Sequence, residues 1–491
     1  MKTTHRIASA LGLGLALLVL LLGLGGARGA SAGPDEPAAP VAPMAPMANA
    51  GWVEIGAGSA SGGGVSGKGA PGNIRRSTDP SVTVGADGRP VVAWVDYTGD
   101  STRQIYVKRW NGSGWVEMGL HSASGMGISN NVQQDAMTPS LTTGPDGKPA
   151  VAWANTGMGW QTYVRSWDGS AWKELGPSSA SGGGVSWFPG DAGVGASGPP
   201  SIAIGPDNKP VVTWGFRHYT GDPHQVYGKK WGGATWDEIG QGSAHGTGIS
   251  KAIDDFGHAD APSIAIGPDG TPVVAFEAYH WDQDAYAGLV DIYVRYFSGG
   301  NWEEMGVGSA SGGGISRTGK AALPSIAIGP DNMPVVAWMD RSNGKQNIYV
   351  RRWDGTTWQP LGQTSAMLGG ISDTTFQAWD ASVAIGPNGL PVVAWINKVS
   401  NPAPQEIYVR RWSGSAWEEI GPGSASGGGI SQTDRMSTSP AVAVGPDNVP
   451  VVAWQEPTSD PQLGGELNIY VRRYAGAPVL NHHAFVGAVF K

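Results

Sequence analysis

The sequence predicts an all-β fold, a seven-bladed β-propeller of four-stranded antiparallel blades, and three observations lead to that prediction. Glycine and proline supply 78 and 36 of the 491 residues, which disfavours long helices. A hairpin-turn motif typified by Gly-Pro-Asp-Gly-x-Pro recurs at Gly85, Gly144, Gly205, Gly267, Gly329, Gly386 and Gly445. Strand-like apolar runs flank each turn, and a period of this kind in an all-β chain indicates propeller blades.

Each repeat contains four expected strands in a fixed order. The first resembles residues 200–204 and ends at the hairpin turn, and the second resembles residues 335–338 and follows it. A third strand resembles residues 348–353, and a short turn leads to a fourth that begins with Trp, as in 358–362. Short turns between consecutive strands predict one antiparallel meander per repeat.

The count of fourth strands indicates how the ring closes. Their first residues are Trp52, Trp115, Trp172, Trp236, Trp302, Trp358 and Trp417. Trp52 precedes any complete blade, whereas the last repeat ends at Tyr474 without a fourth strand. We therefore expect residues 52–56 to complete the seventh blade, which removes the open sheet edges of an unclosed ring.

The chain divides into four expected parts. Residues 1–32 combine Lys2 and Arg6, a long uncharged run and the small residues 30–32, and they predict a secretory signal peptide. An uncleaved membrane anchor is the alternative. Residues 33–50 form a Pro/Ala-rich linker, residues 51–474 the propeller, and residues 475–491 a tail that matches no repeat. These features predict a monomer that is secreted, extracellular or at the cell surface, in contact with a membrane only if the signal stays uncleaved.

Composition excludes several classes of function. The chain has no cysteine, which excludes disulfides, cysteine-ligated metals and a thiol nucleophile. Its 32 basic and 40 acidic residues give no electrostatic reason to expect nucleic acid as a partner.

The repeat sequences PSIAIGPDG, PVVAW, IYVRRW and WEEIG resemble secreted bacterial β-propeller repeats of the sialidase-like and lectin-like group. The resemblance covers residues 51–474 and implies architecture. Sialidase boxes have the form Ser-x-Asp-x-Gly-x-x-Trp, whereas residues 167–172 read Trp-Asp-Gly-Ser-Ala-Trp, with Asp and Gly adjacent. This departure argues against sialidase activity.

Tryptophan usage separates scaffold from candidate site. Eighteen of the 22 tryptophans recur at framework positions of the repeat, and the other four are Trp160, Trp187, Trp281 and Trp379. In a meander, the loops between second and third strands share one face with the crossings between blades. All four leftover tryptophans fall on this face, which we call the variable face and which carries the irregular loops where binding residues are usually found.

The variable face of blades 2 to 4 is the expected ligand-binding site. Its residues are Trp160, Trp187, Phe188, Arg217, His218, Tyr219, His258, Tyr279, His280 and Trp281. Aromatic faces beside polar groups suit a sugar, whose C–H face stacks on a ring while its hydroxyls form hydrogen bonds. An alternative is that these side chains pack loop against loop as a lid.

The predicted function is a secreted binding module that recognises carbohydrate or another extracellular surface ligand, with no cofactor, metal or catalytic residue assigned. Calcium is the alternative use of the Asp254, Asp255 and Asp260 region. A propeller glycosidase of the sialidase type, or a lyase, is the alternative function, with Glu277 and Asp282 as further carboxylates. We prefer the binding function because the polar and aromatic residues that differ between repeats are expected on loops, whereas catalytic groups need rigid supports.

Overall fold

The computed structural model describes residues 51–67, 75–97, 102–131, 133–157, 160–187, 198–217, 223–251, 257–282, 287–398, 404–458 and 466–476. These residues form seven four-stranded antiparallel sheets, and no helix occurs among the elements they contain. The predicted signal peptide, the linker, residues 477–491, Phe188, His218 and Tyr219 lie outside this description.

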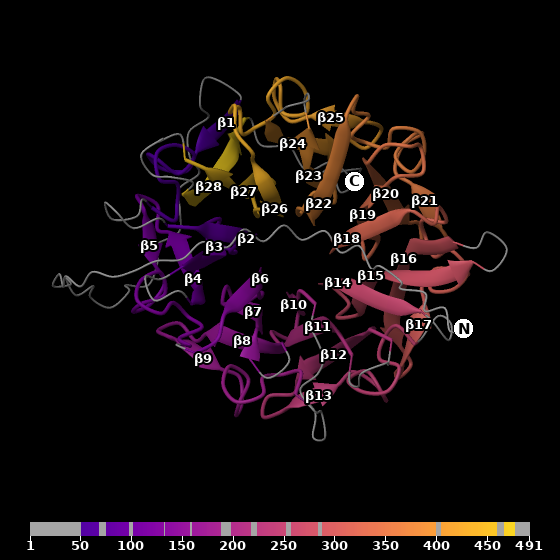
Figure 1. Ribbon diagram of the computed structural model, residues 1–491, viewed down its shortest axis with the longest axis horizontal. Coiled ribbons are helices and arrows are strands. Elements are labelled where there is room, and N and C mark those ends of the chain that lie inside the picture. The colour runs from indigo at the N-terminus through magenta and orange to yellow at the C-terminus, as the bar shows by residue number, and fades with distance from the viewer. Residues whose placement is uncertain are drawn as a thin grey trace, which may run out of the picture. The chain divides into compact units, whose positions relative to one another are not determined.

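The seven sheets are the seven blades of the predicted propeller (Figure 1). Blade 1 contains β2 (Ser77–Val84), β3 (Pro90–Tyr97), β4 (Arg103–Trp110) and β5 (Trp115–Glu117). Blade 2 contains β6 (Ala136–Thr143), β7 (Pro149–Asn155), β8 (Gln161–Trp167) and β9 (Trp172–Glu174). Blade 3 contains β10 (Ser201–Ile204), β11 (Pro210–Phe216), β12 (Gln225–Trp231) and β13 (Trp236–Glu238). Blade 4 contains β14 (His258–Ile266), β15 (Pro272–Asp282), β16 (Ala287–Ser298) and β17 (Asn301–Glu304). Blade 5 contains β18 (Ala321–Ile328), β19 (Pro334–Asp340), β20 (Asn347–Trp353) and β21 (Trp358–Pro360). Blade 6 contains β22 (Gln377–Ile385), β23 (Pro391–Lys398), β24 (Gln405–Trp412) and β25 (Trp417–Glu419). Blade 7 contains β26 (Thr438–Val444), β27 (Pro450–Pro457), β28 (Leu467–Ala475) and β1 (Gly51–Glu54).

The blades form a closed ring around a central channel. The first strand of each blade is innermost and contacts the first strand of the next blade, and β26 contacts β2 to complete the circle. Figure 1 shows these first strands around a common centre. Seven hydrophobic clusters fill the ring, and each joins two neighbouring blades, so the core lies between sheets rather than within one.

The prediction about ring closure is confirmed. β1 pairs antiparallel with β28, with Trp52 opposite Tyr474, so the N-terminal strand completes the blade formed by the C-terminal strands. Fourth-strand tryptophans also link the blades, because each donates its indole Nε1–H to a backbone carbonyl of the preceding blade at 2.7–2.9 Å. The closing member of this set joins Trp52 to Ile420.

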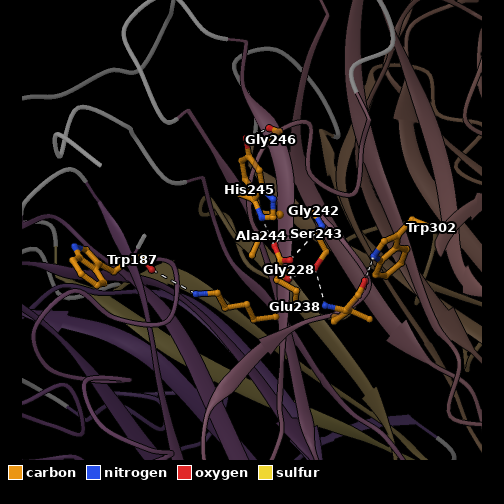
Figure 2. Close-up of polar contacts among 12 residues, drawn as sticks. Trp187, Gly228, Glu238, Gly242, Ser243, Ala244, His245, Gly246 and Trp302 are labelled. Carbon is orange, nitrogen blue, oxygen red and sulfur yellow. Dashed lines mark hydrogen bonds and ion pairs between the residues drawn. The ribbon is translucent and has the colours of Figure 1, made fainter. Parts of the chain in front are cut away.

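In six of the seven blades the fourth strand ends in a glutamate that hydrogen-bonds to the crossing that follows it. In the crossing from blade 3 to blade 4, the Glu238 carboxylate accepts hydrogen bonds from the backbone N–H groups of Gly242 and Ala244 and contacts His245 Nδ1 at 2.5 Å (Figure 2). Trp302 donates to the neighbouring carbonyl of Ile239 in the same view. The glutamate therefore satisfies backbone donors that the turn leaves unpaired.

Candidate functional site

The channel wall is built from one irregularity that every blade contributes. In six blades the register between first and second strands shifts at a β-bulge. The bulged residues Asp79, Thr138, Ala261, Leu323, Asp380 and Ser439 have φ values of 48–57°. In blade 3, Pro199 and Pro200 occupy this place immediately before β10. A bulge re-aims the strand locally, which turns these residues toward the channel.

Serine hydroxyls hold adjacent bulges together. Ser81, Ser140, Ser201, Ser263, Ser325 and Ser382 each accept a hydrogen bond from a backbone N–H of the following blade at 3.0–3.1 Å. The seventh equivalent position is Ala441, which has no hydroxyl. The wall is therefore a nearly continuous circle of interblade hydrogen bonds, and such a wall positions its side chains rigidly.

The channel encloses a pocket of about 460 Å³ lined by bulge residues of all seven blades. This volume lies within the range of about 300–1,000 Å³ typical of small-molecule sites. Only two of the seven bulge positions carry an acid, Asp79 in blade 1 and Asp380 in blade 6. Both are half-buried in the wall. The pocket therefore combines a concave shape with two carboxyl groups.

The two channel carboxyl groups are electrostatically coupled. Burial, with a smaller contribution from the nearby charge of Asp79, raises the pKa of Asp380 to about 6. Burial also raises the pKa of Asp79, which a hydrogen bond from Thr78 and the charge of Arg103 partly offset. Like charges that approach in a desolvated place resist joint ionisation, so the pair favours a state that retains one proton.

A second polar group lies where blades 3 and 4 meet. The backbone N–H of His224 donates to Nδ1 of His258 at 3.0 Å, and Nδ1 of His224 lies 3.7 Å from the Asp260 carboxylate. Gly215 makes room for Asp260, since a Cβ there would lie 2.0 Å from its carboxylate oxygen. Burial lowers the pKa of His258, and the charges of His224 and Arg217 lower it further. Neutral His258 is the expected form.

Glu277 lies on β15, opposite Asp260 of this group, and it forms a hydrogen bond to the neighbouring blade. Its carboxylate accepts a hydrogen bond from the bulge N–H of Leu323 in blade 5 at 2.8 Å. Gln455 of blade 7 makes the corresponding bond to the bulge N–H of Asp79 at 2.7 Å. Burial raises the pKa of Glu277, and the charge of Asp260 adds to the effect. A neutral amide performs the same task in blade 7, so this contact alone does not require a carboxylate.

The structure brings some of the predicted site residues together. Arg217 and His258 interact electrostatically, and Tyr279 is the cross-strand partner of His258 and is partly exposed. Nδ1 of His280 instead lies 3.3 Å from the hydroxyl oxygen of Tyr293. Trp281 lies in β15.

Trp160 and Trp187 lie in different segments of the chain. Trp160 is half-buried, immediately before β8, with a φ of 59°. Trp187 ends the crossing from blade 2 to blade 3 and is 50% exposed. Its ring lies against Gly183, where a Cβ would be 2.4 Å away, and its carbonyl is 3.5 Å from Nζ of Lys229 (Figure 2). Trp187 therefore lies beside the third strand of blade 3.

Two findings differ from the sequence-based expectations. The expectation placed the chemistry on loops, but His258 and Asp260 lie on β14 and Glu277 lies on β15, which are rigid supports. Asp79 and Asp380 were missed as site residues. Alignment of the residue that precedes Pro-Ser, Ala-Ser or Pro-Ala in each repeat would have shown that only these two blades carry an acid there.

Among the described residues, no group of three or more His, Asp or Glu side chains is arranged to hold a metal ion. Asp254 and Asp255, named for the calcium alternative, lie outside the described residues. A search of the described part of the chain for a helix long and apolar enough to cross a bilayer found none.

Comparisons with known proteins give structural likeness only. No protein family matches the sequence, and no curated protein matches it either. Among solved structures, the chain is similar to a PL25 ulvan lyase at 11% identity, with 81% of this chain and 94% of that chain covered and a TM-score of 0.46. A GH93 α-L-arabinofuranosidase of Fusarium graminearum is 10% identical, with 82% and 94% covered and a TM-score of 0.41. A leech intramolecular trans-sialidase is 12% identical, with 81% and 68% covered and a TM-score of 0.38.

The names of these three proteins refer to activities on carbohydrate, and those activities are stated of them alone. The propeller assignment for this chain rests on its own sheet order and on the contacts that close its ring.

Proposed function

We propose that this protein is a carbohydrate-active propeller that cleaves a glycosidic bond at its central channel. The observation that carries the proposal is the coupled pair Asp79 and Asp380 in the wall of the channel pocket. Carboxyl groups with raised pKa values in a concave site are typical of acid–base catalysis. The proposal takes up the glycosidase alternative in preference to a pure binding module.

We assign the two carboxyl groups to the two roles that glycoside hydrolysis needs. One carboxylic acid must protonate the leaving oxygen, and one carboxylate must act as a base or nucleophile. Asp380 is assigned as the acid, because a pKa of about 6 leaves part of it protonated near neutrality. Asp79 is assigned as the carboxylate: burial raises its pKa too, but a hydrogen bond from Thr78 Oγ1 at 3.1 Å and the charge of Arg103 offset part of that rise.

Trp379 directly precedes Asp380, but it packs against the core between blades 6 and 7 and is not among the residues that line the channel pocket. The sugar would enter from the variable face, where the loops differ between blades. The place of action is proposed as extracellular or cell-surface, supported by the signal-like features of residues 1–32.

A second candidate function is glycan binding without turnover through the variable face. Trp187, half-exposed, and Tyr279, partly exposed, favour it, because rings open to solvent are available for stacking. Arg217 and His258 would add directional polar contacts. This candidate needs no acid and base.

The proposal is tested by hydrolysis of a panel of chromogenic glycosides and soluble polysaccharides by the purified protein. Asp380→Asn and Asp79→Asn are each expected to lower kcat at least about 100-fold with an unchanged melting temperature. Glu277→Gln is the matched control, because Gln455 already fills the equivalent role in blade 7, and it should keep activity. Equal turnover of wild type and Asp380→Asn would contradict the proposal.

The second candidate gives a different result in the same experiments. Glycan-array binding without turnover, weakened at least about fivefold by Trp187→Ala, would support the binding module instead. Asp380→Asn should then leave the binding affinity unchanged.

The pH profile gives an independent check of the acid. Asp380 must be protonated to act, so kcat is expected to fall as pH rises through about 6, by about tenfold per unit above it. A profile that rises through this range would assign the acid to another group.

A further inference from the structure

A basic residue of the third strand faces a glutamate of the fourth strand in six of the seven blades. The cross-strand pairs are Lys108–Glu117, Arg165–Glu174, Lys229–Glu238, Arg295–Glu304, Arg410–Glu419 and Arg472–Glu54. Opposite charges at such positions stabilise a sheet, and each glutamate partly neutralises a half-buried cation.

Blade 5 breaks this rule. Arg351 of β20 faces Pro360 of β21, which carries no charge. Within residues 287–398, which are all described, Arg351 forms no ion pair, and its Nη1 donates to the carbonyl of Trp358 at 3.0 Å. Its Nε is buried without a hydrogen-bond partner, as is also true of arginines in other blades. Arg351 is thus a half-buried cation whose usual carboxylate is missing.

A second cation lies at the same place. Each crossing between blades has one residue, directly after a Val-Ser or Ile-Ser pair, that differs around the ring: Gly67, Asn130, Trp187, Lys251, Arg317, Asp373 and Gln432. In the crossing from blade 4 to blade 5 this residue is Arg317, whose charge lowers the pKa of Arg351 in addition to the larger effect of burial. Lys251 similarly precedes Arg295, but Glu304 and Glu303 act on that arginine. Only blade 5 combines two arginines with no glutamate.

A pocket of about 260 Å³ lies between these two arginines. Its wall also includes Trp353, Trp358, Thr356 and Gln359, so hydroxyl and amide groups accompany the guanidinium groups. The volume is slightly below the range of about 300–1,000 Å³ typical of whole-ligand sites, and it suits one anionic group. The pocket shares no lining residue with the central channel.

We propose that blade 5 carries an anion-binding site in which Arg317 and Arg351 hold a carboxylate, sulfate or phosphate group. Guanidinium groups present parallel N–H donors that match the oxygens of such anions. The bound group would occupy the place of the missing glutamate and relieve the repulsion between two arginines. The proposal is independent of catalysis at the channel.

Binding is measured by calorimetry on the whole protein with sodium sulfate and with glucuronic acid, against sodium chloride of equal ionic strength and against glucose. Wild type is expected to bind at least one of the two anions with a Kd of about 1 mM or tighter. Sulfate binding would identify the source as a free inorganic anion. Binding of glucuronic acid alone would identify a sugar-borne carboxylate. Absence of both would overturn the proposal.

The most informative variant restores the missing residue. Pro360→Glu places in blade 5 the carboxylate that six other blades have, and it should weaken anion binding at least about tenfold while the protein stays folded. Arg317→Gln copies the neutral residue of the crossing before blade 7 and should have a similar effect. Arg410→Gln is the control, because Arg410 already has Glu419, and it should leave affinity unchanged. Equal affinity of wild type and Pro360→Glu would contradict the site, whatever happens to hydrolysis at the channel.

Discussion

At the residue scale, one position of the repeat shows how replacing a single side chain changes the chemistry of a contact that recurs around the ring. A serine of each crossing donates its hydroxyl to a side chain in the first half of a third strand, for example Ser129 to Gln104 at 2.6 Å. Five blades have an amide there, whereas blades 4 and 6 have an acid: Ser316 donates to Asp291 at 2.6 Å, and Ser431 donates to buried Glu406 at 2.5 Å. Burial raises the pKa of Glu406 to about 7, so its protonated form resembles the amide of those five blades.

We predict that Glu406→Gln removes a pH dependence of stability. The wild-type carboxyl has an ordinary pKa of 4.5 when unfolded and about 7 when folded. Its contribution is therefore fully present below about 4.5 and is lost as pH rises through about 7. Glu406→Gln should be more stable than wild type above about pH 7, on the order of 1 to 2 kcal/mol after allowance for screening. Urea unfolding at several pH values measures this.

The reverse exchange is the control. Gln104→Glu in blade 1 should introduce the same loss of stability with rising pH, because the position and the serine partner are equivalent. If wild type and Glu406→Gln show parallel curves, Glu406 does not have the raised pKa.

At the element scale, the glycines of the crossings serve close packing. Gly314 has a φ of 59°, and a Cβ there would lie 2.1 Å from the carbonyl oxygen of Ile292. That carbonyl already accepts a hydrogen bond from the backbone N–H of Ile315, the residue after Gly314, at 2.7 Å. The Gly-rich run is therefore where the crossing from blade 4 to blade 5 packs closely on β16, the third strand of blade 4.

A pair of substitutions in one crossing separates the two roles of these glycines. Gly312 and Gly314 both have positive φ, but a Cβ on Gly312 meets no atom within 4 Å. Gly312→Ala should cost about 1 kcal/mol through backbone strain alone, whereas Gly314→Ala adds a steric clash and should cost about 3 kcal/mol or more. Thermal and urea unfolding compare them. Equal losses would mean that the close approach at Gly314 is not a packing constraint.

At the scale of the whole molecule, stability depends on joining the two ends of the propeller. β1 supplies the fourth strand of blade 7, and its Trp52 donates to Ile420 of blade 6. Ser59 adds a hydrogen bond from its hydroxyl to the carbonyl of Val471. Residues more than 350 positions apart in sequence are thus neighbours in the ring.

We predict that deletion of residues 1–60 lowers the melting temperature strongly, because it exposes the edge of β28 and leaves blade 7 with three strands. Deletion of residues 1–48 should leave the melting temperature unchanged, because β1 begins at Gly51. Differential scanning calorimetry of the two truncated proteins makes the comparison. Equal melting temperatures would contradict the role of β1 in closure.

The sequence by itself determined the blade, the number of blades and the closing strand. Turn residues, alternation of strands and spacing of tryptophans are local properties that repeat, so each can be recognised without knowledge of distant contacts. It also directed attention to Arg217 and His258, and the charge of Arg217 lowers the pKa of His258.

Only the tertiary structure decided where chemistry gathers. Asp79 and Asp380 are 301 positions apart in the sequence, and their coupling depends on the ring bringing blades 1 and 6 to one channel. The pocket of blade 5 likewise depends on register, because Pro360 matters only as the residue opposite Arg351. Electrostatic coupling and desolvation follow distance in space, and a repeat pattern does not specify which exceptional residues of different blades will share that distance.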